Sequence, residues 1–170
     1  MKEFNVEIID FNSKDAPKFL TKSLKNTGFA VLKNHNLNIE LINSVYLEWS
    51  SFFDSKYKFN YKFDLVKQDG YFPMRSENAV GYNIKDLKEF YHIYLPWGRV
   101  PKEISNDTII LRNKLVEIAT TILTWIDDNT PDDIRENFSM PLKDMIVDSD
   151  NNLLRIIHYP PLIGNEEENA

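Results

Sequence analysis

Three histidines, His35, His92 and His158, are the residues of this 170-residue sequence best suited to metal chemistry. A non-haem iron(II) site takes two histidines and one carboxylate on one face of the metal and leaves the opposite positions open. The carboxylate commonly stands two residues after the first histidine on a strand, because alternate side chains of a strand point the same way. Here the three positions at that offset hold leucine, tyrosine and proline. No histidine begins such a triad, and for each an ordinary structural role outweighs a role as a ligand.

Other catalytic groups are equally scarce. The sequence has no cysteine, which excludes a thiolate nucleophile, a disulfide framework, a zinc–thiolate site and a cysteine-bound iron–sulfur cluster. A Ser-His-Asp triad is compatible with the composition, but no Gly-x-Ser-x-Gly elbow and no phosphate-binding glycine loop is present. From its residues alone, the chain is an α+β domain without a visible active site.

The charge balance narrows the range of partners. Lys and Arg number 20 and Asp and Glu 26, which gives a net charge of −6 and disfavours nucleic acid and anionic membranes. The aromatic and lysine alternation of residues 57–63 could indicate single-stranded nucleic acid, but lysine stems lying over aromatic rings at a helix end fit better in an acidic chain. No segment has the length of a membrane span, and the N-terminus lacks the apolar run of a signal peptide, so we expect a cytoplasmic protein.

The first half of the sequence predicts two helices, each following a strand. Phe4–Asp10 is typical of a short strand, and Ser13 offers an N-cap for a helix that ends at Gly28. Phe29–Leu32 indicates a buried strand. Asn38 can cap the next helix, whose apolar stripe is expected to be core and contains Leu41, Ile42, Val45, Trp49, Phe52 and Phe53.

The second half predicts a loop, two strands and a long helix. Residues 64–83 have no helical period and indicate an ordered loop or a pair of short strands. Lys88–Leu95 resumes as a strand, and residues 153–159 form a final strand stopped by two prolines. Between these strands Ser105 caps a long helix, whose apolar positions are Leu111, Leu115, Ile118, Ile122 and Ile126. A short helix follows near Pro131. We expect a single domain of the α+β class.

Four segments in order resemble one oxygenase family. They are Thr27–Leu37 with its Gly-Phe and Asn-His pairs, Ser51–Phe53 with the lysine-rich stretch after it, the succession from Gly70–Pro73 through Glu77 and Gly81 to Asp86–Tyr91, and Leu154–Pro161. Together they are similar to the N-terminal half of the isopenicillin-N-synthase-like iron(II)- and 2-oxoglutarate-dependent oxygenases, the non-haem dioxygenase N-terminal region. One departure is Asn36, where the family usually has glycine.

The resemblance implies the framework of a larger enzyme. Residues 1–152 would form the N-terminal region, 153–163 the first strand of a double-stranded β-helix, or jelly roll, and 164–170 a mobile acidic tail. The family's iron ligands and its 2-oxoglutarate-binding arginine follow that first strand, so we assign no catalytic or metal residue here. The complete protein would use Fe(II) and 2-oxoglutarate to oxidise a C–H bond of a small molecule, and this truncated chain is expected to be inactive alone and to bind neither.

The resemblance also suggests contact residues. Arg155 and Tyr159 share one face of the last strand and are candidates to touch 2-oxoglutarate. Tyr71, Arg75 and Glu77 lie in the loop that borders the substrate entrance in such enzymes, and solvent-exposed loop positions are the alternative for each. Lys88 and Glu89 are expected to form a structural pair.

A second hypothesis belongs to another class of protein. The chain could be a non-catalytic interaction domain that keeps the family scaffold and binds a partner. In either case the strand at residues 153–159 would leave an apolar edge open, through which the chain could self-associate. Reading the coding sequence beyond Ala170 would discriminate between the two hypotheses.

Overall fold

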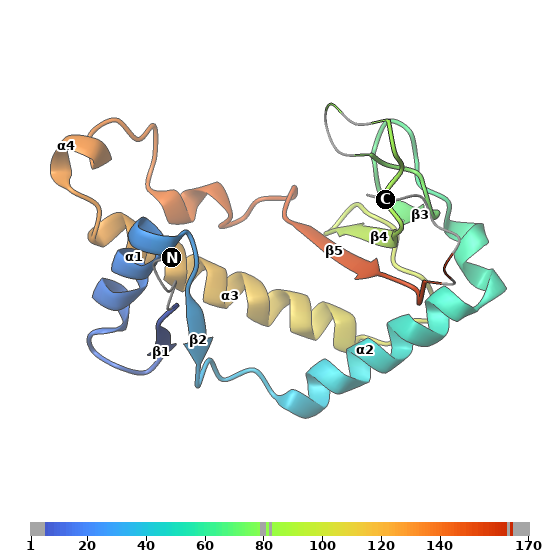
Figure 1. The fold of residues 1–170 in the computed structure, drawn as a ribbon, viewed down its shortest axis with the longest axis horizontal. Helices are drawn as coiled ribbons and strands as arrows, with labels where there is room; N and C mark the ends of the chain where they lie inside the picture. The colour runs from blue at the N-terminus through green and yellow to red at the C-terminus, as the bar shows by residue number, and fades with distance from the viewer. Residues whose placement is uncertain (1–5, 79–80, 82, 163, 165–170) are drawn as a thin grey trace. The chain divides into compact units, whose positions relative to one another are not determined.

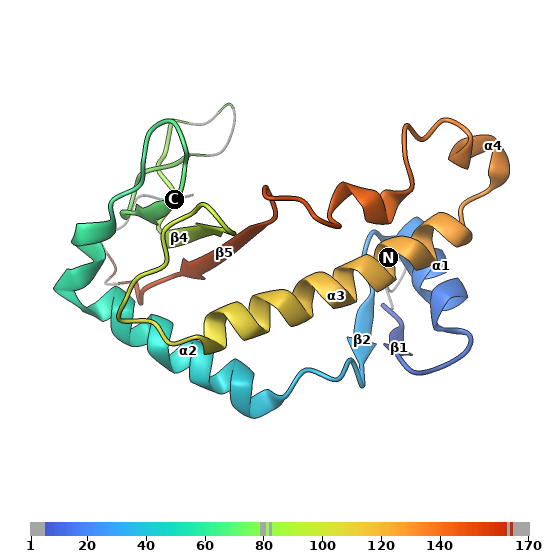
Figure 2. The ribbon, with the colours of Figure 1, turned by 180° about the vertical axis from the view of Figure 1, so that it is seen from behind.

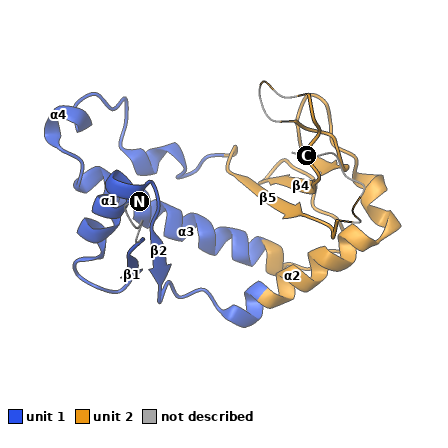
Figure 3. Ribbon diagram, viewed as in Figure 1, with its two compact units in different colours: residues 1–42, 109–149 blue, residues 43–108, 150–170 orange. Residues whose placement is uncertain are grey.

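The computed structural model describes residues 6–78, 81, 83–162 and 164 (Figures 1 and 2). It divides into two compact units (Figure 3), one of residues 1–42 and 109–149 and one of residues 43–108 and 150–170. The final strand pairs with a strand of the second unit, and the division into ranges 1–152 and 153–163 stays a prediction. Of the predicted tail, only Gly164 lies within the described residues. No helix of the described residues could span a membrane.

The first unit combines a two-stranded sheet with helices. β1 (Ile8–Asp10) pairs in parallel with β2 (Val31–Lys33). The helices are α1 (Ala16–Thr27), most of α3 (Asp107–Asp128) and α4 (Asp132–Arg135), followed by the 3-10 helix η2 (Leu142–Met145). Their apolar core consists of Ile9, Ala16 and Leu20, packed against Leu24, Ala30, Leu32, Ile122, Trp125 and Ile126.

Two local predictions for this unit need correction. Ser13 does not cap α1: its hydroxyl accepts the backbone N–H of Asp15, the N-cap residue, whose own side chain forms no capping bond. The strand after Gly28 is shorter than predicted and not buried, with Phe29 70% and Val31 48% exposed. The sheet has only two described strands, so part of its surface stays open. The predicted stop is confirmed, because Gly28 ends α1 at a φ of 77°.

Helix α2 (Ile39–Asp54) begins in the first unit, and its greater part, from Asn43 on, belongs to the second. The Asn38 side chain accepts the Glu40 N–H at 2.7 Å, which confirms the predicted cap. The buried part of the predicted stripe is Val45, Trp49, Phe52 and Phe53. The indole N–H of Trp49 donates to the hydroxyl of Thr108 at 2.9 Å in the interior. The 3-10 helix η1 (Lys56–Tyr61) follows, and its Lys58 lies over aromatic rings, as the alternation predicted.

The second unit also holds a three-stranded antiparallel sheet in the order β3-β4-β5. β3 is Gly70–Phe72, β4 is Glu89–Tyr94 and β5 is Leu153–His158. The final strand is confirmed to within one residue, and the region predicted as loop or paired strands contributes β3. Within the described residues β5 pairs on one side only, with β4. The predicted α+β class is confirmed.

Candidate functional site

One face of the β3-β4-β5 sheet carries a cluster of aromatic and charged side chains. Alternation along the strands puts Phe72, Phe90, His92 and Arg155 on this face, and the register sets His92 opposite Arg155. Phe72 and Phe90 are stacked with ring centroids 4.5 Å apart. The paired strands therefore fix a flat apolar base beneath the polar groups. We call this surface the open face, because Arg155 and Glu77 above it keep about a third of their side-chain surface exposed.

Arg155 is held on three sides. Its guanidinium carbon lies 4.0 Å from the centroid of the Phe90 ring. Its Nε–H donates to Nε2 of His92 at 2.8 Å, and one terminal nitrogen donates to both carboxylate oxygens of Glu77 at 2.9 and 3.0 Å. A guanidinium can only donate. Phe90 and His92 therefore orient the Arg155 guanidinium, and the Glu77 carboxylate binds its outer end.

His92 is fixed in one neutral form by these contacts. Since Arg155 donates to Nε2, the ring proton lies on Nδ1, which is 2.9 Å from the carbonyl oxygen of Gln68 and donates to it. Burial lowers the pKa of His92, and the positive charge of Arg155 adds to that effect. Both ring nitrogens are occupied, so His92 has no free lone pair for a metal.

The loop before β4 brings further charges to the open face. Lys88 lies 2.6 Å from a carboxylate oxygen of Asp86 and 3.5 Å from Glu77. The hydrogen bond to Asp86 and the two nearby carboxylates raise the pKa of Lys88. Lys88 therefore pairs with these two acids and not, as predicted, with Glu89. Arg75 lies in the same loop, is exposed, and has a positive φ of 62°.

The opposite face of the sheet is closed around Glu89. Its carboxylate accepts bonds from the Tyr71 hydroxyl at 2.5 Å and from Lys58 at 2.9 Å, and it lies 2.8 Å from Nδ1 of His158. The His158 ring stacks on Phe53 of α2. Burial works to raise the pKa of Glu89, but these hydrogen bonds outweigh it and the net pKa is lowered. We call this network the closed face.

Tyr71 belongs to the closed face. Only 2% of its surface is exposed, and burial together with the bond to Glu89 raises the pKa of its hydroxyl. This position favours a packing role for Tyr71 over contact with a substrate. Tyr159, just after β5, is instead 68% exposed and helps to line a cavity of about 360 Å³, together with Asp86, Leu87, Lys88, Pro160 and Leu162.

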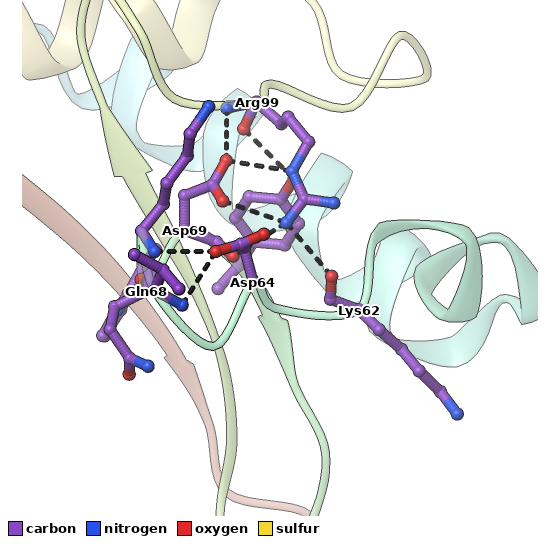
Figure 4. Close-up of polar contacts among 9 residues, drawn as sticks. Lys62, Asp64, Gln68, Asp69 and Arg99 are labelled. Carbon is purple, nitrogen blue, oxygen red and sulfur yellow. Dashed lines mark hydrogen bonds and ion pairs between the residues drawn. The ribbon is translucent and has the colours of Figure 1, made fainter.

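A group of polar contacts between Arg99 and Asp69 lies beside β3 and explains why Gly70 begins that strand (Figure 4). Arg99 binds the buried Asp69 carboxylate through its backbone N–H, Nε and a terminal nitrogen, and also donates to the carbonyl of Lys62. A Cβ on Gly70 would lie 2.6 Å from Arg99 and 2.5 Å from the Tyr61 carbonyl, and its φ is +100°. Only glycine fits there, which gives the Gly-Tyr motif a structural reason.

The described residues do not fit an iron site. His92 and His158 lie on opposite faces of the sheet, by the strand register, and His35 accepts the backbone N–H of Leu37 at 3.4 Å. Among the described residues, no group of three or more histidine and acidic side chains could hold a metal ion. The sequence did not predict the contact of His92 with Arg155 or that of Lys88 with Glu77. Alternation along residues 88–92 does place Lys88 and His92 on one face.

Comparison with known proteins matches residues 6–110 to the family described as non-haem dioxygenase in morphine synthesis N-terminal. A solved Shewanella oneidensis protein, named for an expected oxygenase activity, is 41% identical with a TM-score of 0.83, covering 98% of this chain and 58% of that chain. A Caulobacter crescentus protein assigned to the 2OG-Fe(II) oxygenase family is 27% identical with a TM-score of 0.69, covering 93% and 57%.

The fold extends to more distant structures. A full-length Neurospora crassa protein, solved in complex with alpha-KG, is 18% identical with a TM-score of 0.67, covering 91% of this chain and 54% of that chain. No curated protein gave a match. The chain spans between 54% and 58% of the length of these three structures. It belongs to the non-haem dioxygenase N-terminal family, the N-terminal region of the iron(II)- and 2-oxoglutarate-dependent oxygenases.

Proposed function

We propose that this chain is the N-terminal framework of an oxygenase that couples conversion of 2-oxoglutarate to oxidation of a small-molecule C–H bond. The match of residues 6–110 to the dioxygenase N-terminal family carries this proposal. Strand β5 supports it, because its outer edge has no partner among the described residues and can receive the next strand of a jelly roll. In this proposal the iron ligands come from sequence beyond this chain.

The chain alone is then inactive. Purified chain with iron(II) and 2-oxoglutarate should form no succinate above the level of the metal and buffer without protein. Chain extended through whatever coding sequence follows Ala170 should form succinate when substrate is supplied. Succinate formed above background by the 170 residues alone would contradict the proposal, as would a stop codon directly after Ala170 in the gene.

Within the longer protein, the open face would receive a carboxylate of 2-oxoglutarate or of the substrate. Arg155 supports this role, because its outer end already binds one carboxylate, that of Glu77, in a geometry a ligand could reproduce. Glu77 comes from a loop and would yield its place to the ligand. Tyr159 lies at the end of the same strand, and Arg75 and Glu77 would contact polar groups of a substrate.

These roles can be separated by binding measurements on the extended protein. Arg155→Gln should weaken 2-oxoglutarate or substrate about tenfold or more, the loss expected for one charge-assisted carboxylate fork. Tyr159→Phe should have a smaller effect. Arg135→Gln is the matched control, because Arg135 pairs with Asp132 in the other unit. Unchanged affinity for both ligands in Arg155→Gln would remove Arg155 from the site.

The alternative function is a non-catalytic interaction domain. One observation favours it: the β5 edge lies beside apolar groups that are 42% to 68% exposed, namely Leu153, Ile157, Tyr159 and Leu162. An exposed strand edge with such neighbours would self-associate or bind a partner strand. Sedimentation of the chain alone should then show concentration-dependent dimers, and Ile157→Lys should remove them. A monomer at all concentrations would contradict self-association.

A further inference from the structure

A row of three lysines runs along the exposed side of α1. Lys18, Lys22 and Lys25 are spaced by four and three residues, so they share one helix face. The row spans about 10 Å, because an α-helix rises about 1.5 Å per residue. The row is locally cationic, although the net charge of the chain is −6.

These lysines have no acidic partner in the described part of the chain. The ion pairs formed there use other cations, chiefly Lys58, Lys88, Arg99, Arg135 and Arg155. The one basic residue of α4, Arg135, already neutralises Asp132. The three ammonium groups are therefore free to attract an acidic ligand.

An apolar groove lies beside the row, within the same unit. Its volume is about 540 Å³, and its other walls come from α1, the end of α3 and the region of α4. The apolar lining consists of Leu24, Ile126, Pro131, Ile134 and Phe138. Ile134 is 51% exposed, so part of the apolar lining is open to a ligand.

The polar side chains that line the groove form hydrogen bonds within the protein. The hydroxyl of Thr21 on α1 donates to the carbonyl of Pro17 and lies 3.5 Å from that of Trp125 on α3. At the end of α3, the Thr130 hydroxyl and the Asn129 amide donate to backbone carbonyls one turn earlier. The polar groups of the lining are thus satisfied within the protein, which leaves lysines and apolar side chains for a ligand.

We propose that this groove binds an acidic amphipathic peptide segment of a partner protein. A helix in the groove would place apolar side chains on the lining and carboxylates, at the spacing of one and two turns, against the lysine row. Three cations spread over about 10 Å match separated carboxylates better than the single head group of a fatty acid. The proposed oxygenase function does not depend on this surface.

The test is a binding titration with the 170-residue chain. The probe is a labelled helical peptide with glutamates at positions i, i+4 and i+7 and leucines on the adjoining face. Its fluorescence anisotropy should report saturable binding at about 50 mM salt and weaker binding at about 500 mM, where charges are screened. Amide shifts should be confined to α1, α4 and the end of α3.

Variants separate this groove from general charge. K18E/K22E/K25E should weaken the peptide about tenfold or more, since three exposed pairs are lost and three repulsions are added. The matched control K62E/K67E/K102E changes the net charge equally at exposed lysines of the other unit and should change affinity less than about threefold. Ile134→Ser should weaken binding through the apolar lining alone.

Four results would overturn the proposal. The first three are the absence of saturable peptide binding, equal weakening by the control triple variant, and amide shifts outside the groove. Tight binding of dodecanoate at the groove in place of the peptide would also overturn it, because the ligand would then be a single-headed amphiphile. Circular dichroism of each variant, compared with the parent, shows whether folding is retained.

Discussion

The two faces of the β3-β4-β5 sheet carry the same kinds of groups in opposite settings. On the closed face, Glu89 is 5% exposed in its side chain and is bound by three neighbours. On the open face, Glu77 is 36% exposed and contacts Arg155 and Lys88 at the rim. Both are glutamates paired with cations. The difference teaches that burial decides which pair stabilises the fold and which can exchange its partner for a ligand.

Removal of Glu89 should have the largest effect. Glu89→Leu leaves Lys58 and His158 without their carboxylate in the interior, and breaking a buried network of this kind costs roughly 3–5 kcal/mol. Urea unfolding of the chain measures it. The matched change on the open face, Glu77→Leu, should cost less than about 1 kcal/mol, because exposed pairs contribute little. Similar losses from both variants would erase the distinction between the faces.

Both faces share the strand β3, which begins at Gly70. Gly70→Ala should cause the next largest loss of stability. The new Cβ would meet the Tyr61 carbonyl and Arg99 at a positive φ, which costs roughly 2–3 kcal/mol in strain and displaced contacts. Gly81→Ala is the control, because its φ is +86° and nothing lies within 4 Å of its Cβ position. Equal unfolding free energies for the two variants would show that the close packing at Gly70 carries no cost.

Acid should act on the two faces in separate pH ranges. The pKa of His92 is lowered from 6.5 in the folded chain, so protonation favours the unfolded chain and stability falls as the pH drops below 6.5. The pKa of Glu89 is lowered from 4.5, so its contribution is complete above that value and is lost as the pH falls through the folded pKa. The open face therefore responds first.

Unfolding free energies measured across this range test the order. His92→Gln should remove the fall that begins near pH 6.5 and leave the lower one. Glu89→Gln should keep the first fall and reduce the lower one, to which other carboxylates of lowered pKa, such as Asp69, also contribute. A parent protein whose stability is constant from about pH 7 to about pH 5 would contradict the role of His92.

The smallest effect is expected at the rim of the open face. Lys88→Met removes the contacts to Asp86 and Glu77 and should change the unfolding free energy by less than about 1 kcal/mol. Amide exchange in residues 74–78 should nevertheless become faster, because the loop loses an anchor. Exchange as slow as in the parent would mean that Arg155 alone holds Glu77.

Local signals were sufficient for much of the fold. Asn38 as a cap, Gly28 as a stop and the stripe through Trp49 and Phe53 depend on neighbours in the chain, and all were confirmed. The exposure of Phe29 was missed because a compact apolar run does not show how many strands will flank it. Ser13 was placed too early as a cap, since helix ends shift by a residue or two without changing the pattern.

The candidate site was only half visible in the sequence. Arg155 and Glu77 were found through the resemblance, but their pairing across 78 residues was not. Tyr71 was likewise found through the resemblance, as a residue that contacts substrate. In the structure its hydroxyl bonds to Glu89 in the interior. Spacing along a strand fixes which face a side chain takes, but not which distant strand lies next to it.

The sequence by itself determined the main helices, the strands β4 and β5, the scarcity of metal ligands and the family, because these follow from local propensity, alternation and ordered motifs. Tertiary structure alone decided that Glu89 is buried and Glu77 is not, and that one histidine serves each face. Strand pairing brings together residues far apart in the chain, and burial then fixes how strongly each charge holds its partner.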